Sequence, residues 1–207
     1  MRWIVLQLAD SAFPAGGFAH SMGLEAAIGL GLVRGASSVA RFAEHALWQA
    51  GTGGLPLVRA AHADPLRLGE LDAIADSFLT SHVANRASRT QGRALAQACA
   101  ASFGVASRRA HLAPVFGALA AELGVTLDEA SALWLHGASR TVLSAAVRLG
   151  ALGPHEAQGV QRALAPVCDR VLEACAALGP DDLAVSAPIA ELAGAMHDKL
   201  YSRLFQS

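Results

Sequence analysis

Adjacent polar residues near the N-terminus are the only arrangement in this sequence that suggests nucleophilic catalysis. His20 and Ser21 follow Asp10 and Ser11, so a hydrolase of the Ser-His-Asp type is one interpretation. The sequence lacks the nucleophile elbow G-x-S-x-G around Ser21, and a serine at the start of a helix is more simply a cap. A hydrolase that uses His20 and Ser21 is therefore the less favoured alternative.

Metal-ligating residues do not gather along the chain. No two of the eight histidines lie within one helical turn of each other, so there is no H-x-x-x-H pair. Cys168 and Cys175 are seven residues apart, which corresponds to about 10 Å along a helix and is too far for one metal ion. We therefore predict no metal site and no cofactor, although a site assembled from distant histidines stays open.

The single lysine excludes a phosphate-binding loop. Lys199 follows Met196-His197-Asp198, whereas G-x-x-x-x-G-K-[ST] requires glycine directly before the lysine. A net charge of −1 and a pI of about 6.7 give no indication of nucleic-acid binding. Because no catalytic set emerges, we expect a protein that is not an enzyme.

Two predicted helices carry polar groups that need partners. Arg89 and Arg93 fall on one side of a helix predicted over 83–103, while Gln91 falls within its apolar stripe. A buried amide must find hydrogen bonds, so Gln91 is either a structural tie or part of a polar site. Arg140 lies in a nearly apolar segment, 127–151, and we expect carbonyl or carboxylate groups to satisfy it as a structural brace.

The elements that position these residues are predicted to be helices. Alanine and leucine dominate, and β-branched and aromatic residues are sparse. Asp64-Pro65 and the capping box from Thr126 to Glu129 mark helix starts. We predict one all-α domain over 1–207, a compact bundle of about nine or ten helices, with an irregular segment to about Ala19. The expected helices are 21–33, 38–50, 54–63, 65–81, 83–103, 110–123, 127–151, 154–178 and 187–199.

The composition is apolar for a soluble protein. Hydrophobic residues make up 53% and charged residues 16%, so either a membrane or partner proteins should cover much of the surface. The charge-free stretches 11–24 and 94–107 are too short to span a membrane, and the N-terminus does not resemble a signal peptide. Three cysteines without framework spacing are typical of a reducing compartment. We therefore expect a cytoplasmic protein with partner-covered surfaces and no membrane contact.

Residues 10–25 read D-S-A-F-P-A-G-G-F-A-H-S-M-G-L-E. This segment resembles the N-terminal signature of the UreF family of urease accessory proteins, D-S-x-F-P-x-G-x-F-x-H-S-x-G-L-E, and matches it at every fixed position. Four further matches follow in the family's order: Arg89-x-Gln91-Gly92-Arg93; His111 with Phe116-Gly117; residues 144–150 with Gly153-Pro154 and Gln158; and His197-x-x-x-Tyr201-Ser202-Arg203-Leu204-Phe205-x-Ser207.

The resemblance implies an all-α, non-catalytic adaptor that forms a homodimer. Its partners would be an accessory protein of the UreD/UreH type, the GTPase UreG and apo-urease. The complex would support GTP-dependent nickel insertion, and the adaptor would modulate GTP hydrolysis by UreG. A metallochaperone that binds nickel directly is the alternative within the same process.

Three groups of residues are predicted to bind these partners. The tail, 200–207, carries large apolar groups and is expected to dock on a UreD-type partner, with docking on the protein's own core as the alternative. The second group is His20, Ser21 and Glu25, which follow the loop 14–18. The third group is Arg89, Gln91 and Arg93 of the helix predicted over 83–103. The predicted partner-binding residues are His20, Ser21, Glu25, Arg89, Gln91, Arg93, Tyr201, Arg203, Leu204 and Phe205.

Overall fold

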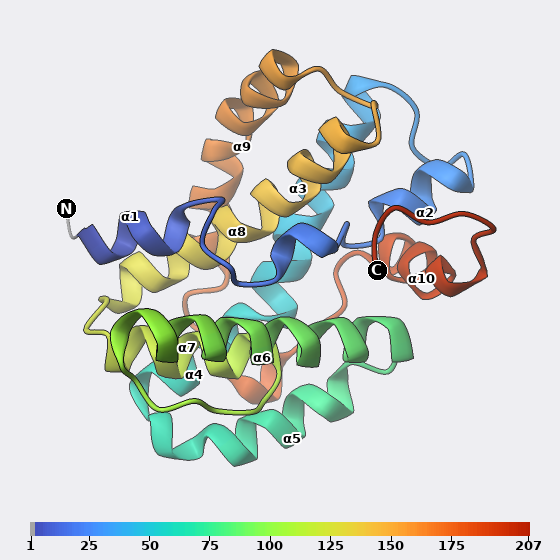
Figure 1. Cartoon of the computed structure of the whole chain (residues 1–207). Helices are drawn as coiled ribbons and strands as arrows, with labels where there is room; N and C mark the ends of the chain where they lie inside the picture. The colour runs from blue at the N-terminus through green and yellow to red at the C-terminus, as the bar shows by residue number, and fades with distance from the viewer. Residues whose placement is uncertain (1–2) are drawn as a thin grey trace.

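The computed structural model describes residues 3–207, which contain ten α-helices, four short 3-10 helices and no strand (Figure 1). The all-α prediction is confirmed. The α-helices are α1 (Trp3–Ala9), α2 (Leu24–Gly29), α3 (Ala36–Gly53), α4 (Leu55–Ala63), α5 (Leu68–Phe78), α6 (His82–Phe103), α7 (Leu112–Glu122), α8 (Leu127–Arg148), α9 (Pro154–Ala174) and α10 (Pro188–Ala195). The 3-10 helices are η1 (Gly17–Ala19), η2 (Pro65–Arg67), η3 (Pro180–Asp182) and η4 (His197–Lys199).

Helix α8 runs through the middle of the fold and packs against α3, α4 and α9 (Figure 1). Its buried face includes Leu135, Val142 and Ala145, which the solvent does not reach. The segment was expected to be buried because its sequence is apolar nearly all round. This helix is therefore the support on which the N-terminal segment and the chain end are placed.

Small residues allow the helices of this bundle to approach closely. Helices α4 and α7 make the most extensive helix pair, and a Cβ atom at Gly117 would collide with the carbonyl of Val58. A Cβ atom at Gly92 of α6 would likewise collide with the carbonyl of Ala110. Larger side chains at these positions would force the backbones apart, since close-packed interiors tolerate little added volume.

Local capping signals in the sequence correctly mark two helix starts. The Thr126 hydroxyl accepts a hydrogen bond from the Glu129 amide at 3.3 Å, and the Glu129 carboxylate accepts one from the Thr126 amide at 3.0 Å. The Asp64 carboxylate accepts a hydrogen bond from the Leu66 amide at 3.0 Å. Each cap satisfies backbone donors that the first helical turn leaves without partners.

The N-terminal part of the chain differs from the prediction in two ways. Residues 3–9 form α1 rather than an irregular segment, because Ile4, Val5 and Leu8 pack against the junction of α7 and α8. The helix expected over 21–33 is reduced to α2, because Met22 and Gly23 have positive φ angles of 52° and 84°. Such angles lie outside the right-handed helical region, so the helix cannot begin earlier.

The C-terminal helices are shorter than predicted. Helix α9 ends at Ala174 rather than 178, and α10 ends at Ala195 and is followed by η4. The segment 65–81 divides into η2 and α5. No helix within residues 3–207 has the length and apolar character needed to cross a membrane.

Candidate functional site: the docked C-terminal tail

The end of the chain lies against the N-terminal signature segment (Figure 1). The Ser21 amide donates a hydrogen bond to the Ser207 carbonyl at 2.6 Å, and the Gln206 amide donates one to the Ala19 carbonyl at 2.8 Å. Two motifs at opposite ends of the sequence therefore form one structural unit. We call this unit the tail site: residues 18–25, Arg148 and 197–207.

Glu25 anchors the tail through its carboxylate. Its Oε1 accepts a hydrogen bond from the Leu204 amide at 2.6 Å, and its Oε2 accepts bonds from the Phe205 amide at 3.1 Å and from His197 Nε2 at 2.9 Å. Glu25 is 8% exposed and His197 is fully buried. A buried carboxylate needs several donors, and hydrogen bonds to a charged acceptor are stronger than neutral ones.

Arg148 joins the signature segment to the tail from the side of α8. Its guanidinium carbon lies 3.8 Å from the ring centroid of Phe18 and 4.3 Å from that of Phe205. Its Nη1 also donates a hydrogen bond to the Phe18 carbonyl. Phe205 is 5% exposed, so the guanidinium contributes a cation–π contact to an aromatic ring that is already packed in the core.

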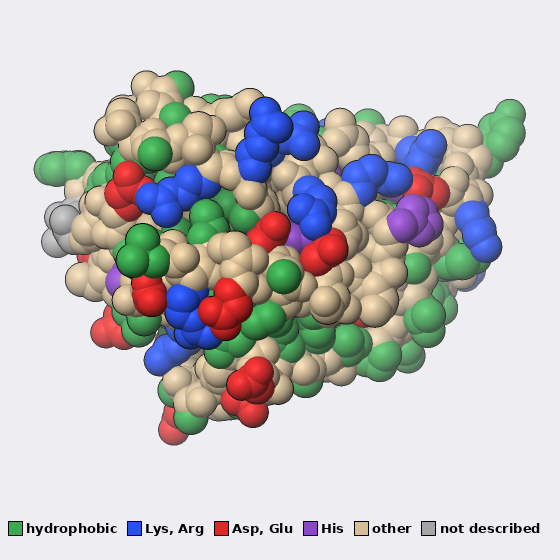
Figure 2. All heavy atoms as spheres, turned by 90° about the horizontal axis from the view of Figure 1, so that it is seen from below, with side chains coloured by type: hydrophobic (Ala, Val, Ile, Leu, Met, Phe, Trp, Pro, Cys, Tyr) green, Lys and Arg blue, Asp and Glu red, His purple; other side chains and the backbone are tan. Residues whose placement is uncertain are grey.

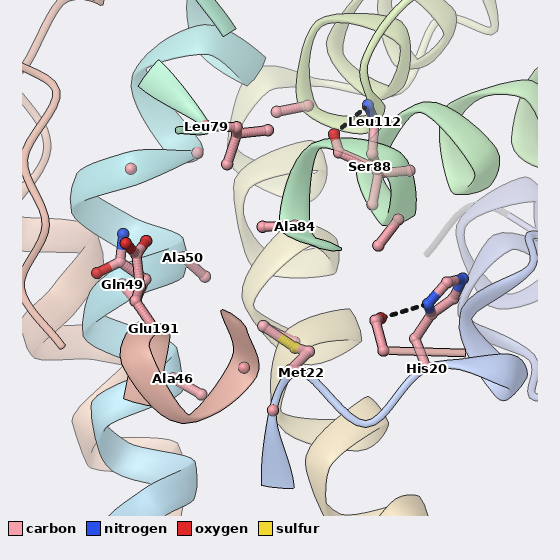
Figure 3. A pocket seen from close by; sticks show the side chains of 18 of the residues that line it. His20, Met22, Ala46, Gln49, Ala50, Leu79, Ala84, Ser88, Leu112 and Glu191 are labelled. Atoms are coloured by element: carbon pink, nitrogen blue, oxygen red, sulfur yellow. Dashed lines mark hydrogen bonds between the residues drawn. The ribbon is translucent and has the colours of Figure 1, made fainter. Parts of the chain in front are cut away.

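His20 and Ser21 bind the last residue of the chain. His20 Nδ1 lies 2.6 Å from Ser207 Oγ (Figure 3), and the Ser21 hydroxyl donates a hydrogen bond to the Ser207 carbonyl at 2.8 Å. The Glu25 amide donates to Ser21 Oγ at 3.3 Å, which is the helix-capping contact expected for this serine. No hydrogen bond links His20 to Ser21 in the described structure, and Ser21 is fully buried.

Burial keeps the His20 imidazole uncharged. Removal from solvent is the main reason that the pKa of His20 is lowered to about 4, and the nearby His197 and Arg86 lower it further. Charging this ring would place a desolvated cation near the Arg86 guanidinium. At neutral pH, His20 is therefore a neutral partner of Ser207.

Part of the tail faces outward. Tyr201 is fully exposed and Leu204 is 53% exposed, while Phe205, whose ring lies beside Arg148 of α8, is buried. Arg203 Nη1 contacts Asp198 Oδ1 at 2.8 Å, and Arg86 of α6 contacts the same carboxylate at 2.9 Å. The docked tail thus presents an aromatic ring, an aliphatic side chain and an arginine at the surface.

A cavity of about 290 Å³ lies beside the tail site. Figure 3 shows His20 and Met22 at one side of it, with Gln49 and Ala50 of α3 across from them. Its wall is mostly apolar, and Gln91 of α6 and Ser207 also line it. Gln91 was predicted to be a tie or part of a polar site; its amide makes no hydrogen bond to any described residue, and the residue lines this cavity.

The two other predicted residues of α6 lie on its outer face. Arg89 contacts Asp76 of α5 at 2.7 Å and Asp72 at 3.8 Å, so it braces α5 against α6. Hydrogen bonds from Asn85 and Arg89, and one from His111, hold the pKa of Asp76 well below its usual range. Arg93 is exposed and forms no ion pair within residues 3–207. Figure 2 shows basic, acidic and histidine side chains close together across the lower face of the molecule.

The structure adds two residues that were not predicted to act at this site. Arg148 lies within the matched segment 144–150, and His197 begins the matched C-terminal segment. Their position in the matched segments was the one sequence feature that could have identified them. The neighbouring residues in the sequence did not indicate that Arg148 would contact Phe205 or that His197 would contact Glu25. Among residues 3–207, no three His, Cys, Asp or Glu side chains come together in a way that could hold a metal ion.

Comparison with known proteins agrees with the sequence motifs. The sequence model of the UreF family matches residues 33–165. Urease accessory protein F of Arabidopsis thaliana is 34% identical over 223 residues, covering 100% of this chain and 93% of that protein. Urease accessory protein UreF of Roseobacter denitrificans is 33% identical, covering 97% of this chain and 91% of that protein. The chain therefore belongs to the UreF family of urease accessory proteins.

Proposed function

We propose that this protein is a non-catalytic adaptor in urease maturation. It joins an accessory protein of the UreD/UreH type to the GTPase UreG and to apo-urease, supports GTP-dependent nickel insertion, and modulates GTP hydrolysis by UreG. It acts as a cytoplasmic homodimer, as the family resemblance implies. The observation that carries the proposal is the docked tail, which holds Tyr201 and Leu204 at the surface while Phe205 and Glu25 fix its path.

The exposed groups of the tail have the chemistry of a protein-binding surface. Aromatic and arginine side chains are the groups that most often carry binding energy at such surfaces. Tyr201 and Leu204 are exposed on a segment that already has backbone hydrogen bonds to Glu25 and Ala19. A segment held in this way loses less conformational freedom on binding than a free tail would, so more of the contact energy remains as affinity.

The tail is also attached to the protein's own core, which was the alternative to partner docking. Phe205 and Ser207 are buried, whereas Tyr201 and Leu204 are not. Burial of Phe205 and Ser207 supports docking on the core for those two residues, and the exposure of Tyr201 and Leu204 leaves these two side chains accessible to a partner. The partner-binding proposal concerns the outward-facing side chains, and the inward-facing ones position them.

Two other functions differ from this proposal in what the isolated protein should do. A nickel metallochaperone would bind nickel tightly and stoichiometrically, which calorimetry would detect. A hydrolase would need a free Ser21 hydroxyl, but that hydroxyl donates to the Ser207 carbonyl and has no bond to His20. An esterase activity that Ser21→Ala abolishes would favour the hydrolase.

The test of the adaptor proposal is co-purification of the tagged protein with the other urease maturation proteins. The double variant Tyr201→Ser, Leu204→Ser should lose most of the UreD/UreH-type partner. Leu66→Ser is the matched control, because Leu66 is also highly exposed but lies in η2. Substitution is preferable to deleting 201–207, since deletion would also remove Phe205 from the core.

Normal capture of the partner by the double variant would contradict the role of the tail. Normal urease activation in cells that lack this protein would contradict the adaptor role as a whole. The control variant should capture the partner as well as the unchanged protein does. Circular dichroism of each variant would show that its helices remain folded.

A further inference from the structure

A second cavity, of about 440 Å³, lies between the N-terminal loop and α8. Residues 11–19 line it together with the end of α1 and with residues of α6, α7 and α8, among them Gln91 and Phe116. Its volume lies in the range of cavities that bind small molecules. Tail docking does not use the α8 residues that line it, so they are available for another role.

A guanidinium group without a carboxylate partner lines this cavity. Arg140 is partly buried, and its Nη1 donates a hydrogen bond to the Ala9 carbonyl at 2.7 Å. No ion pair connects Arg140 to an acidic side chain within residues 3–207. The predicted brace therefore exists as a single carbonyl contact, and most of the five N–H donors of the guanidinium stay available.

Two further polar side chains line the same cavity. His136 lies one helical turn before Arg140 on α8, and burial together with the Arg140 charge lowers its pKa. A neutral imidazole still offers one N–H donor. The Gln91 amide, which makes no hydrogen bond to the described part of the chain, adds another donor from α6.

The described lining contains no negative charge to balance Arg140. No Asp or Glu side chain is among the residues that surround the cavity. The nearest acidic residue in sequence to the loop lining is Asp10, which is exposed and accepts a hydrogen bond from the Ala12 amide at 2.8 Å. A partly buried cation surrounded by donors favours an anion that can accept from several of them.

We propose that this cavity binds a small oxyanion, a carboxylate or a phosphate group, through Arg140, with Gln91 and His136 as additional donors. The planar guanidinium fork matches two oxygens of either group. The shared chemistry is the oxyanion, and the test compares a phosphate with a carboxylate. This inference does not depend on the adaptor role, because the cavity is separate from the exposed side chains of the tail.

The experiment titrates the full-length protein with inorganic phosphate and, separately, with acetate at constant ionic strength. The ring resonances of His136 are followed by NMR over a range of pH. A bound anion offsets the charge of Arg140, so the pKa of His136 should rise in a saturable way. His155, which is exposed on α9, is the internal control, and its ring resonances should not follow the same saturation curve.

Variants of the arginine test the assignment. For whichever of the two anions binds more tightly, Arg140→Gln should lower the affinity by at least about tenfold. This is the range expected when a charged hydrogen-bond partner is lost. Arg140→Lys keeps the charge and should bind with intermediate affinity. Arg162→Gln removes an exposed arginine of α9 and should bind as the unchanged protein does.

Two results would overturn the inference. One is the absence of any saturable change in the pKa of His136 when either anion is added to the unchanged protein. This result does not depend on the folding of a variant. The other is equal anion affinity for the unchanged protein and Arg140→Gln. Preference for phosphate or for acetate would identify which oxyanion the cavity selects.

Discussion

Replacement of Glu25 by glutamine would test the buried carboxylate that holds the tail. The substitution keeps the size of the side chain and leaves α2 in place, but it replaces one oxygen with an amide that donates. The remaining oxygen can still accept one or two of the bonds from the Leu204 amide, the Phe205 amide and His197 Nε2, and at least one of these donors is left facing the new amide group.

The magnitude follows from the number and type of bonds lost. Hydrogen bonds to charged groups contribute about 1.5–3 kcal/mol each, so loss of one or two should destabilise tail docking by about 3 kcal/mol. That free energy corresponds to a change on the order of a hundredfold in the ratio of docked to undocked tail. Helix α8 should stay folded, because it packs mainly against α3, α4 and α9.

Hydrogen exchange measures this change directly. The amides of Leu204 and Phe205 should exchange on the order of a hundredfold faster in Glu25→Gln, while amides in α8 keep their protection. Glu173→Gln is the matched control, since Glu173 is exposed on α9. Unchanged protection of Leu204 and Phe205 in Glu25→Gln would refute the assignment of Glu25 as the anchor of the tail.

Two further predictions concern charge. Arg89→Glu should lower the melting temperature, because it places like charges together at the contact between α5 and α6. Arg93→Glu should leave the melting temperature unchanged and lower the capture of urease maturation partners. Equal melting temperatures for the two variants would count against Arg89 as a brace between α5 and α6. The pKa of His20 is lower in the folded protein than its ordinary value, so its contribution to stability is fully present above about pH 6.5 and is lost as the pH falls toward about 4. His20→Gln should flatten the fall in unfolding free energy over this interval, measured by denaturant titration, and an unchanged pH profile would show that His20 does not titrate as described.

Helix positions set by local signals could be predicted from the sequence. The helix expected to start at 127 does start there, because the Thr126 and Glu129 side chains satisfy its first backbone donors whatever the rest of the fold does. The helix expected over 83–103 is α6, which begins one residue earlier. Helix α1 was not predicted, because seven residues of apolar sequence become helical only when they pack on α7 and α8.

The sequence singled out several residues of the tail site, and their role in partner binding stays a prediction; their geometry was not predicted. His20, Ser21 and Glu25 were expected to meet partners, and the structure buries all three beneath the tail. Arg89 was grouped with Arg93, but the acidic residues of α5 that bind it lie in a different helix. Neither outcome could be seen from the spacing of residues within one segment.

By itself, the sequence determined the helical class, the absence of a phosphate-binding loop and membership of the UreF family, because composition, capping and motifs are local properties. The tertiary structure decided which of those motifs meet: His20 and Ser207 are 187 positions apart, and only the packing of the bundle brings them within 2.6 Å. Burial also decides chemistry, since the same packing satisfies Glu25, leaves His20 neutral and leaves Arg140 without a carboxylate among the described residues. Contacts between distant segments depend on the whole fold, so no window of the sequence contains them.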